Sequence, residues 1–582
     1  MTRMIASAAA CGVLATLAGC SNSDPINVRT STPIKHLVVI FQENVSFDHY
    51  FGTYPLAANG SGEPAFTAAP DTPTANTLVT PLDPENGFAP LQGVDLMQQN
   101  PNYTNKANND SSKNSQATNP FRLSRAQAAT MDQDHDYLPE QLAFDNGLMD
   151  LFPLNTGAGD TAAPTDQSPP LNTTGLVMGY YDGNTVTALW NYAQHFAMSD
   201  NSYGTQFGPS TVGALNLISG QTNGVVASNA AAANGGGSNM DDEIASDGQG
   251  GITVSGDPQP LGDLCTSRDA VQKSGKNIGD LLSAANVSWG FFQGGFDLTI
   301  TNTDGSTGCM RTTTSTVTQQ KKVDYIPHHE PFQYYASTAN PQHTRPSSPA
   351  AIGGGSDGAN HQYDSHDFFD ALDAGNFPSV VFLKAPGYQD GHAGYSDPLD
   401  EQTFVVDTIN RIQQSPEWSS TVVVIAYDDS DGWYDHQMSP VVNPSTNTAD
   451  SANATMNGVA VVGTADGLAS PGVCQSTGAQ QGRAAPTSPI GGANGRCGYG
   501  PRLPLLVVSP YAKPNYVSHR VTDQSSVLRF IEDNWSTGRI GNFSFDAKAG
   551  SLDDMFAFTA IGPVGFNRLI LDPATGEPKR GW

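Results

Sequence analysis

Residues 34–44 read IKHLVVIFQEN, an apolar run that ends in an amide, a carboxylate and a second amide. Residues 421–432, TVVVIAYDDSDG, repeat this arrangement, with two aspartates directly after the apolar run. Neither run alternates apolar and polar residues, which is typical of parallel strands covered on both faces. Together with two similar runs, they predict four buried parallel strands: Ile34–Phe41, Ser379–Lys384, Thr421–Tyr427 and Leu503–Ser509.

Three segments that alternate with these strands have the spacing of amphipathic helices. They are Ala188–Ser199, Glu401–Gln414 and Val527–Trp535, the last preceded by the candidate N-caps Asp523 and Ser525. Strands that alternate with helices indicate an α/β fold, here an α/β/α sandwich with a largely parallel central sheet. The 60 glycines and 40 prolines predict long loops, which we place as insertions near residues 56–120, 221–260 and 440–500.

The chain is acidic. Its 582 residues include 27 Lys and Arg against 56 Asp and Glu, a formal charge of −29. Nucleic acids and anionic membranes need a basic face, so we expect no nucleic-acid partner. A charged fraction of only 14% excludes a charge-rich disordered chain.

The N-terminus has the pattern of an export signal. A basic start precedes an apolar stretch, Ile5–Ala18, and the run Leu17-Ala18-Gly19-Cys20 resembles a bacterial lipobox. We expect residues 1–19 to be a lipoprotein signal peptide, Cys20 to carry lipid and residues 20–32 to be a tether. The protein would then be periplasmic, anchored to the outer membrane or secreted, and would meet a membrane only through that lipid. An ordinary signal peptide or a short buried helix are the alternatives.

Four cysteines remain after Cys11 and Cys20 are set aside. An even number in an oxidising compartment favours two disulfides. Of the three possible connectivities we predict the local one, Cys265–Cys309 and Cys474–Cys497.

Polar clusters follow the predicted strands where each one ends. Glu43 and Asn44 follow the first strand, Asp428 and Asp429 follow the third, and His392 lies shortly after the second. Ligands of open α/β sheets gather at the carboxyl ends of the strands. These side chains therefore predict one site.

Seven segments also resemble, in order, motifs of the bacterial phosphoesterase family, which comprises phospholipases C and respiratory-burst-inhibiting acid phosphatases of the acid phosphatase A type. They are ENVSFDHYFG (43–52), SDNSYGTQFGPS (199–210), PHHEPFQYY (327–335), FLKAPGYQDGHAGYSDP (382–398), YDDSDGWYDH (427–436), GPRLPLLVVSPYAK (500–513) and VLRFIEDNW (527–535). The resemblance implies a fold similar to alkaline phosphatase and a single phosphoesterase catalytic domain over residues 33–582.

The resemblance implies one divalent metal ion, held by Glu43, Asn44, Asp428 and Asp429 with the nucleophile as a further ligand. An all-oxygen ligand set favours Ca²⁺, Mg²⁺ or Mn²⁺ over Zn²⁺. Taken alone, the first pair could cap a helix and the second could form a solvated turn.

The nucleophile implied by the resemblance is Ser210, in the segment Phe207-Gly208-Pro209-Ser210-Thr211, and Thr211 is its neighbouring competitor. Phosphoryl-binding and catalytic roles fall on His135, His328, His329 and His392, whereas His49 and His436 are interpreted as supporting residues. We expect protonated imidazoles to bind the phosphoryl group and one to protonate the leaving alkoxide. The adjacent His328 and His329 can share one site only on a loop or bulge.

The sequence thus predicts an exported hydrolase of phosphate monoesters, an acid phosphatase with a phosphoserine intermediate. The alternative is a phospholipase C that cleaves phospholipid diesters at the same site, with Tyr334 and Tyr335 as candidates for a head-group pocket. A serine lipase is disfavoured because the segment GPSTVG is not G-x-S-x-G. A non-enzymatic adhesin does not account for the motifs. The sequence leaves the oligomeric state open.

Overall fold

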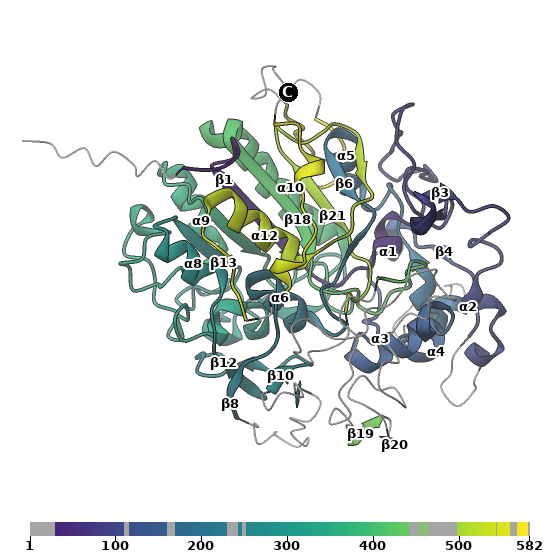
Figure 1. Ribbon diagram of the computed structural model, residues 1–582, viewed down its shortest axis with the longest axis horizontal. Helices are drawn as coiled ribbons and strands as arrows, with labels where there is room; N and C mark the ends of the chain where they lie inside the picture. Colours follow the sequence, from purple (N-terminus) through teal and green to yellow (C-terminus); the bar gives the residue numbers. More distant parts are fainter. Residues whose placement is uncertain are drawn as a thin grey trace, which may run out of the picture.

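The computed structural model describes residues 29–109, 116–159, 169–229, 243–246, 252–440, 453–456, 459–462, 498–542, 544–558 and 567–579. Its centre is an eight-stranded sheet with the strand order β16-β13-β17-β1-β18-β21-β6-β22 (Figure 1). In that order the strands are Gln362–Asp364, Trp289–Gln293, Val380–Lys384, His36–Gln42, Thr421–Tyr427, Leu505–Val508, Ala197–Ser199 and Tyr516–Ser518.

Strand β1 lies in the middle of the sheet and runs parallel to both of its neighbours. It pairs with β18 from His36 opposite Thr421 to Gln42 opposite Tyr427, and with β17 on its other edge. Every residue of β17 and β18 is buried, because helices cover both faces. The α/β fold and these three predicted strands are confirmed.

Strand β21 differs from the expectation, because it runs antiparallel to both β18 and β6. It is also shorter than the predicted segment, since it spans Leu505–Val508. A continuous apolar run indicates that a strand is buried on both faces, but it does not indicate whether the strand runs parallel or antiparallel to its neighbours. The remaining strand pairs of the large sheet are parallel, so the sheet is largely parallel as predicted.

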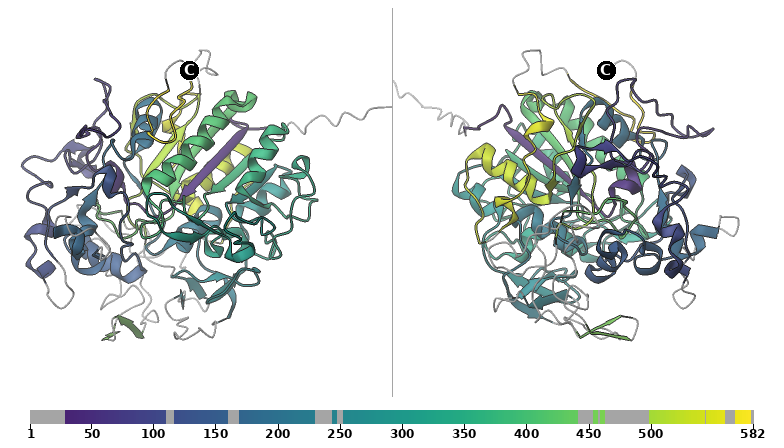
Figure 2. Two further views of the ribbon diagram at one scale, coloured as in Figure 1. Left: turned by 180° about the vertical axis from the view of Figure 1, so that it is seen from behind. Right: turned by 45° about the vertical axis from the view of Figure 1, so that its right-hand side comes forward.

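The helices lie on both faces of the sheet. Helices α10 (Pro398–Gln414) and α9 (Ser365–Asp373) cross one face, and α12 (Gln524–Trp535) and α6 (Ser210–Ser219) cover the other (Figures 1 and 2). The predicted helices at 401–414 and 527–535 are confirmed and begin three residues earlier than expected, after Asp397 and Asp523 respectively.

The predicted helix Ala188–Ser199 is wrong at its C-terminal end. Helix α5 spans Thr187–His195, and Ala197–Ser199 forms β6, which pairs with β21 and β22. The helical spacing of apolar residues continues through Phe196 and Ala197, so it does not reveal where the helix ends. Ala197–Ser199 is a strand because it pairs with β21 on one edge and with β22 on the other.

The remaining elements are short. They are α1 (Phe47–Phe51), β2 (Leu82–Asp83), β3 (Ala89–Pro90), α2 (Pro101–Thr104), β4 (Phe121–Arg122), α3 (Tyr137–Phe144), α4 (Phe152–Asn155), β5 (Gly179–Tyr180), β7 (Ser202–Tyr203), β8 (Val225–Asn229), β9 (Ile244–Ser246), β10 (Ile252–Val254), β11 (Gln259–Pro260), β12 (Ala270–Lys273), α8 (Ile278–Ala284), β14 (Thr312–Thr314), β15 (Lys321–Val323), β19 (Asn453–Met456), β20 (Val459–Val462) and β23 (Thr522–Asp523). The segment from α1 to α4 lies at one side of the sheet, on the right in Figure 1.

The predicted disulfide Cys265–Cys309 is formed, with the two Cα atoms 5.2 Å apart. The predicted pair Cys474–Cys497 and the predicted signal peptide lie outside the described residues. Across the ranges that the structure describes, no helix combines the length and the apolar character needed to cross a membrane.

Candidate active site

The predicted metal ligands come together because β1 and β18 are parallel neighbours in register. Glu43 and Asn44 follow β1, and Asp428 and Asp429 follow β18. All four side chains are buried, and the backbone N–H of Asn44 donates to Oδ1 of Asp428 (3.3 Å). Asn44 has a φ of 38°, in the left-handed region that asparagine tolerates, and this turns the chain out of the strand.

Ser210 is the first residue of α6, and its hydroxyl points at this cluster. Its Oγ lies 3.0 Å from Oε2 of Glu43, 3.1 Å from Oδ2 of Asp429 and 3.4 Å from Oδ1 of Asn44. The neighbouring Thr211 instead donates its backbone N–H to Oδ1 of Asp257 (2.8 Å). The structure therefore places Ser210, and not Thr211, against the predicted ligands.

Helix α6 reaches this position because a glycine allows it to touch the loop after β18. A Cβ atom built on Gly213 would lie 2.0 Å from the carbonyl oxygen of Asp428. Close packing of α6 on this loop therefore sets the distance between Ser210 and the carboxylates.

Lys384 is a site residue that the sequence analysis missed. It ends β17, is buried, and its Nζ contacts Oε1 of Glu43 and Oδ2 of Asp428, the second at 2.9 Å. Burial lowers the pKa of Lys384, but the charges of Asp428 and Glu43 outweigh this and raise it. A lysine at the end of a fully apolar strand was the signal available in the sequence, since a buried ammonium needs an anionic partner.

The buried carboxylates of the site carry more negative charge than Lys384 can balance. Burial raises the pKa of Glu43 and of Asp428, although Lys384 opposes both shifts. Burial, together with the charge of Asp428, raises the pKa of Asp429 to about 8. Three buried carboxylates that share one ammonium fit a divalent cation, and the oxygen donors suit a hard ion.

His329 and His328 lie on a 3₁₀ turn, Pro327–His329, so that adjacent residues can face one site as the sequence analysis required. Nδ1 of His329 lies 3.3 Å from Oε1 of Glu43, and the two imidazole rings are 4.5 Å apart. Nδ1 of His328 accepts a hydrogen bond from Arg268 (3.2 Å). Both histidines thus lie beside the Ser210 cluster, His329 deeper and His328 nearer to solvent.

His135 and His392 form the other side of the site, with ring centroids 5.8 Å apart. Nε2 of His135 lies 3.2 Å from Nδ2 of Asn44. Asp132 and Asp431, which the sequence analysis did not single out, complete a group of four side chains whose ligand atoms lie within 4.8 Å of one another and could hold a metal ion.

The surroundings of the four histidines shift their pKa values in opposite directions. Burial lowers the pKa of His392 to about 4 and lowers the pKa of His328 and His329 well below the usual value. Burial also lowers the pKa of His135, but Asp429 and two further aspartates outweigh it, so the pKa is raised. The protein thus disfavours the protonated form of three of these imidazoles and favours that of His135.

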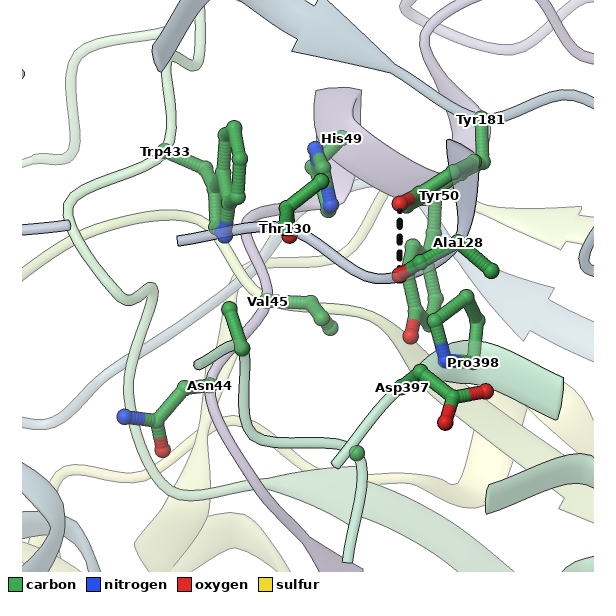
Figure 3. Close-up of a pocket in the computed structure, with 12 residues that line it drawn as sticks. Asn44, Val45, His49, Tyr50, Ala128, Thr130, Tyr181, Asp397, Pro398 and Trp433 are labelled. Carbon is green, nitrogen blue, oxygen red and sulfur yellow. Dashed lines mark hydrogen bonds between the residues drawn. The ribbon is translucent and has the colours of Figure 1, made fainter. Parts of the chain in front are cut away.

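The supporting residues His49 and His436 lie behind the site. His49 stacks on Trp433 with ring centroids 3.9 Å apart, and its Nδ1 pairs with the carbonyl oxygen of Gly179 (2.8 Å). Figure 3 shows both rings in the wall of a small cavity that Asn44 borders. His436 pairs with Asp48 at 2.5 Å.

Tyr334 and Tyr335 do not form a head-group pocket. Both are buried, Tyr334 donates its hydroxyl to the carbonyl oxygen of Pro258, and Tyr335 donates to Oγ of Ser219 (3.0 Å). Their aromatic rings are part of the hydrophobic core, so these two candidates for the head-group pocket of the alternative function are not available to a ligand.

The chain is similar in sequence to known proteins. The family model described as "Phosphoesterase family" matches residues 34–538. A non-hemolytic phospholipase C of Pseudomonas aeruginosa is 29% identical over 163 residues, which cover 28% of this chain and 20% of that protein. A hemolytic phospholipase C of the same species is 28% identical over 193 residues, 32% of this chain and 21% of that protein.

A longer match is more distant. Phospholipase C A of Mycobacterium tuberculosis is 22% identical over 508 residues, which cover 86% of this chain and 72% of that protein. In the first curated relatives, by contrast, the match spans only about a fifth of the relative's length.

Proposed function

Because the chain belongs to the phosphoesterase family, we propose that it is an exported hydrolase of phosphate monoesters that works through a phosphoserine at Ser210. One observation supports this most strongly. The Ser210 hydroxyl lies within 3.4 Å of three predicted metal ligands, Glu43, Asn44 and Asp429, and histidines surround the same cluster.

The residues fit one oxygen-ligated divalent ion, held by Glu43, Asn44, Asp428 and Asp429 with Ser210 as a further ligand. Ca²⁺, Mg²⁺ or Mn²⁺ would suit this donor set better than Zn²⁺. When bound, such an ion supplies positive charge that stabilises an alkoxide and a phosphoryl oxygen at neutral pH.

The chain's own residues account for the remaining chemistry. Oγ of Ser210 attacks phosphorus as its proton passes to the carboxylate of Asp429 or Glu43, both of which it contacts. The bond to the leaving oxygen breaks, and water then hydrolyses the phosphoserine. Neutral imidazoles of His328, His329 and His392 donate hydrogen bonds to the phosphoryl oxygens, where charge is spread in the transition state. The leaving alkoxide takes its proton from a protonated histidine, the form that the aspartates around His135 favour.

The test is hydrolysis of an aryl phosphate by purified protein, measured with and without a chelator. We expect turnover that the chelator abolishes and that re-added Ca²⁺, Mg²⁺ or Mn²⁺ restores. Turnover that survives exhaustive chelation would contradict the metal, and no turnover with any phosphate ester would contradict the function.

A second candidate is a phospholipase C, because the relatives named above carry that name. The substrate would be a phospholipid diester cleaved at the same serine. The burial of Tyr334 and Tyr335 removes the aromatic side chains that the sequence offered for a choline head group. A choline-type diester in the same assay separates the two, since a preference for it over the monoester would favour the second candidate.

Export is proposed from the signal pattern of residues 1–19, and the Cys265–Cys309 disulfide supports an oxidising compartment. We expect the mature protein to begin at Cys20 and to carry lipid. Mass spectrometry of the N-terminal peptide checks this, and a Cys20→Ser variant should lose the added mass.

A further inference from the structure

Two basic side chains stand at the solvent side of the site, in a chain whose net charge is strongly negative. Nζ of Lys322, on β15, lies 3.3 Å from the ring centroid of Tyr395, and that ring stacks on His392 with centroids 4.4 Å apart. Lys322 is partly exposed, whereas Ser210 and Lys384 are buried. The lysine is thus one aromatic ring away from a predicted phosphoryl ligand.

Arg268 lies on the other side of the site, beside His328 of the His328–His329 pair. It is exposed, and its Nη2 donates to Nδ1 of His328 (3.2 Å) and to the backbone oxygen of Asp257 (2.8 Å). Because Nδ1 of His328 accepts this bond, the proton of the neutral ring is on Nε2, and Arg268 fixes that tautomer.

Neither cation has a carboxylate partner at salt-bridge distance. Among the described residues, no Asp or Glu oxygen lies within 4.0 Å of Nζ of Lys322 or of the Arg268 guanidinium, although other basic residues form such pairs. The adjacent Lys321, for example, pairs with Asp304 at 2.7 Å. Carboxylates act on both cations from a greater distance, Asp390, Glu43 and Asp132 on Lys322 and Asp257 on Arg268. Because no carboxylate in the part of the chain that the structure describes contacts them directly, the two cations can still bind an anion that enters with the substrate.

The aromatic face of Tyr395, beside His392, already holds a cation. A pocket for a quaternary ammonium needs a free aromatic face, and Lys322 occupies that of Tyr395. A choline group would also meet the positive charges of Lys322 and Arg268. The rim therefore disfavours a cationic substrate and favours an anionic one.

We propose that Lys322 and Arg268 select phosphate monoesters whose alcohol part bears a second anionic group, such as a carboxylate or another phosphate. This rests on the proposed monoesterase activity and names its substrate class. The two residues bind the distal anion, while Ser210 and the histidines act on the scissile phosphoryl group.

The test compares kcat/KM for phenyl phosphate, 4-carboxyphenyl phosphate and choline phosphate. The variants are Lys322→Met, Arg268→Met and the double variant, with Lys321→Met as the matched control on the same strand. The quantity compared is kcat/KM for 4-carboxyphenyl phosphate divided by kcat/KM for phenyl phosphate. Intrinsic differences between the two leaving groups cancel when this ratio is compared between variants.

We expect each rim variant to lower this ratio about three- to fivefold, through KM, and the double variant to lower it about tenfold. Lys321→Met should leave it unchanged, and about 0.5 M salt should reduce the wild-type ratio toward that of the double variant. Choline phosphate should be the poorest wild-type substrate and should improve in the double variant.

One result would overturn the inference while the proposed function stands. If the ratio stayed constant across the variants, even with an equal fall in kcat/KM for both aryl phosphates, the cations would only balance the site's own carboxylates. Failure of the wild type to hydrolyse any of the three monoesters would instead overturn the proposed function, and the inference with it.

Discussion

At the scale of single residues, the site holds three buried carboxylates, Glu43, Asp428 and Asp429. The charge of Lys384 alone does not balance them. Lys384 contacts Glu43 and Asp428, and Asp429 is left beside the Ser210 hydroxyl. The strand-end carboxylates could be predicted from their position after apolar runs, and the serine only from the family resemblance. Lys384 could not be assigned, because only the parallel placement of β17 beside β1 brings it to the two carboxylates.

Asp429→Asn should release the metal. The amide keeps the shape of the carboxylate but removes the negative charge that attracts a hard cation. We expect the bound metal, measured by elemental analysis after dialysis, to fall at least about tenfold, and activity to fall about a hundredfold or more. The exposed Asp553→Asn is the matched control, and equal metal content in both variants would contradict Asp429 as a ligand.

His519 gives a pH-dependent contribution to stability away from the site. Burial lowers its pKa, but the hydrogen bond to Asp200 (2.8 Å) and the charge of Asp200 outweigh this and raise the pKa above 6.5. The stabilisation is therefore complete below about pH 6 and is lost as the pH rises through the raised pKa.

His519→Gln should accordingly lower the free energy of unfolding more at pH 5.5 than at pH 9. The difference should be about 0.5 kcal/mol, because solvent screens this partly exposed pair. Denaturant titrations at the two pH values measure it, and a larger loss at pH 9 would show that the pairing is not what stabilises the native state.

At the scale of elements, burial could be predicted from the sequence better than direction or boundaries. β1, β17 and β18 were recognised from uninterrupted apolar runs. The antiparallel direction of β21 was not, because a doubly covered strand has the same composition in either direction. Ala197–Ser199 was assigned to a helix because apolar residues continue past the end of α5, and only pairing with β21 makes it a strand.

Gly213→Ala tests the packing of α6 on the loop after β18. The added methyl group would overlap the carbonyl oxygen of Asp428, so the helix or the loop must move. We expect a loss of about 1–3 kcal/mol in the free energy of unfolding, with a further loss of activity because Ser210 is on the same helix.

Gly355→Ala is the matched control, since the nearest atom to its added Cβ is 3.8 Å away. Thermal unfolding and kcat of both variants are the readouts. If the two substitutions had the same small effect, the close approach of α6 would not be what positions the serine.

At the scale of the whole molecule, the Cys265–Cys309 bridge closes a 44-residue separation in the part of the chain that also provides Arg268. In the loop-entropy description, such a link stabilises the native state by about 4 kcal/mol relative to the unfolded chain. The double variant Cys265→Ser with Cys309→Ser should therefore have a clearly lower Tm than wild type under non-reducing conditions. Equal Tm values would show that the bridge contributes nothing to stability.

Trapping the covalent intermediate shows which residue is the nucleophile. The protein is quenched in acid during turnover of an aryl phosphate, digested and mapped by mass spectrometry. We expect a phosphate on Ser210, absent in Ser210→Ala and present in Thr211→Ala, with kcat about a thousandfold or more lower only in the first variant. A phosphate on Thr211, or full activity of Ser210→Ala, would show that Ser210 is not the nucleophile.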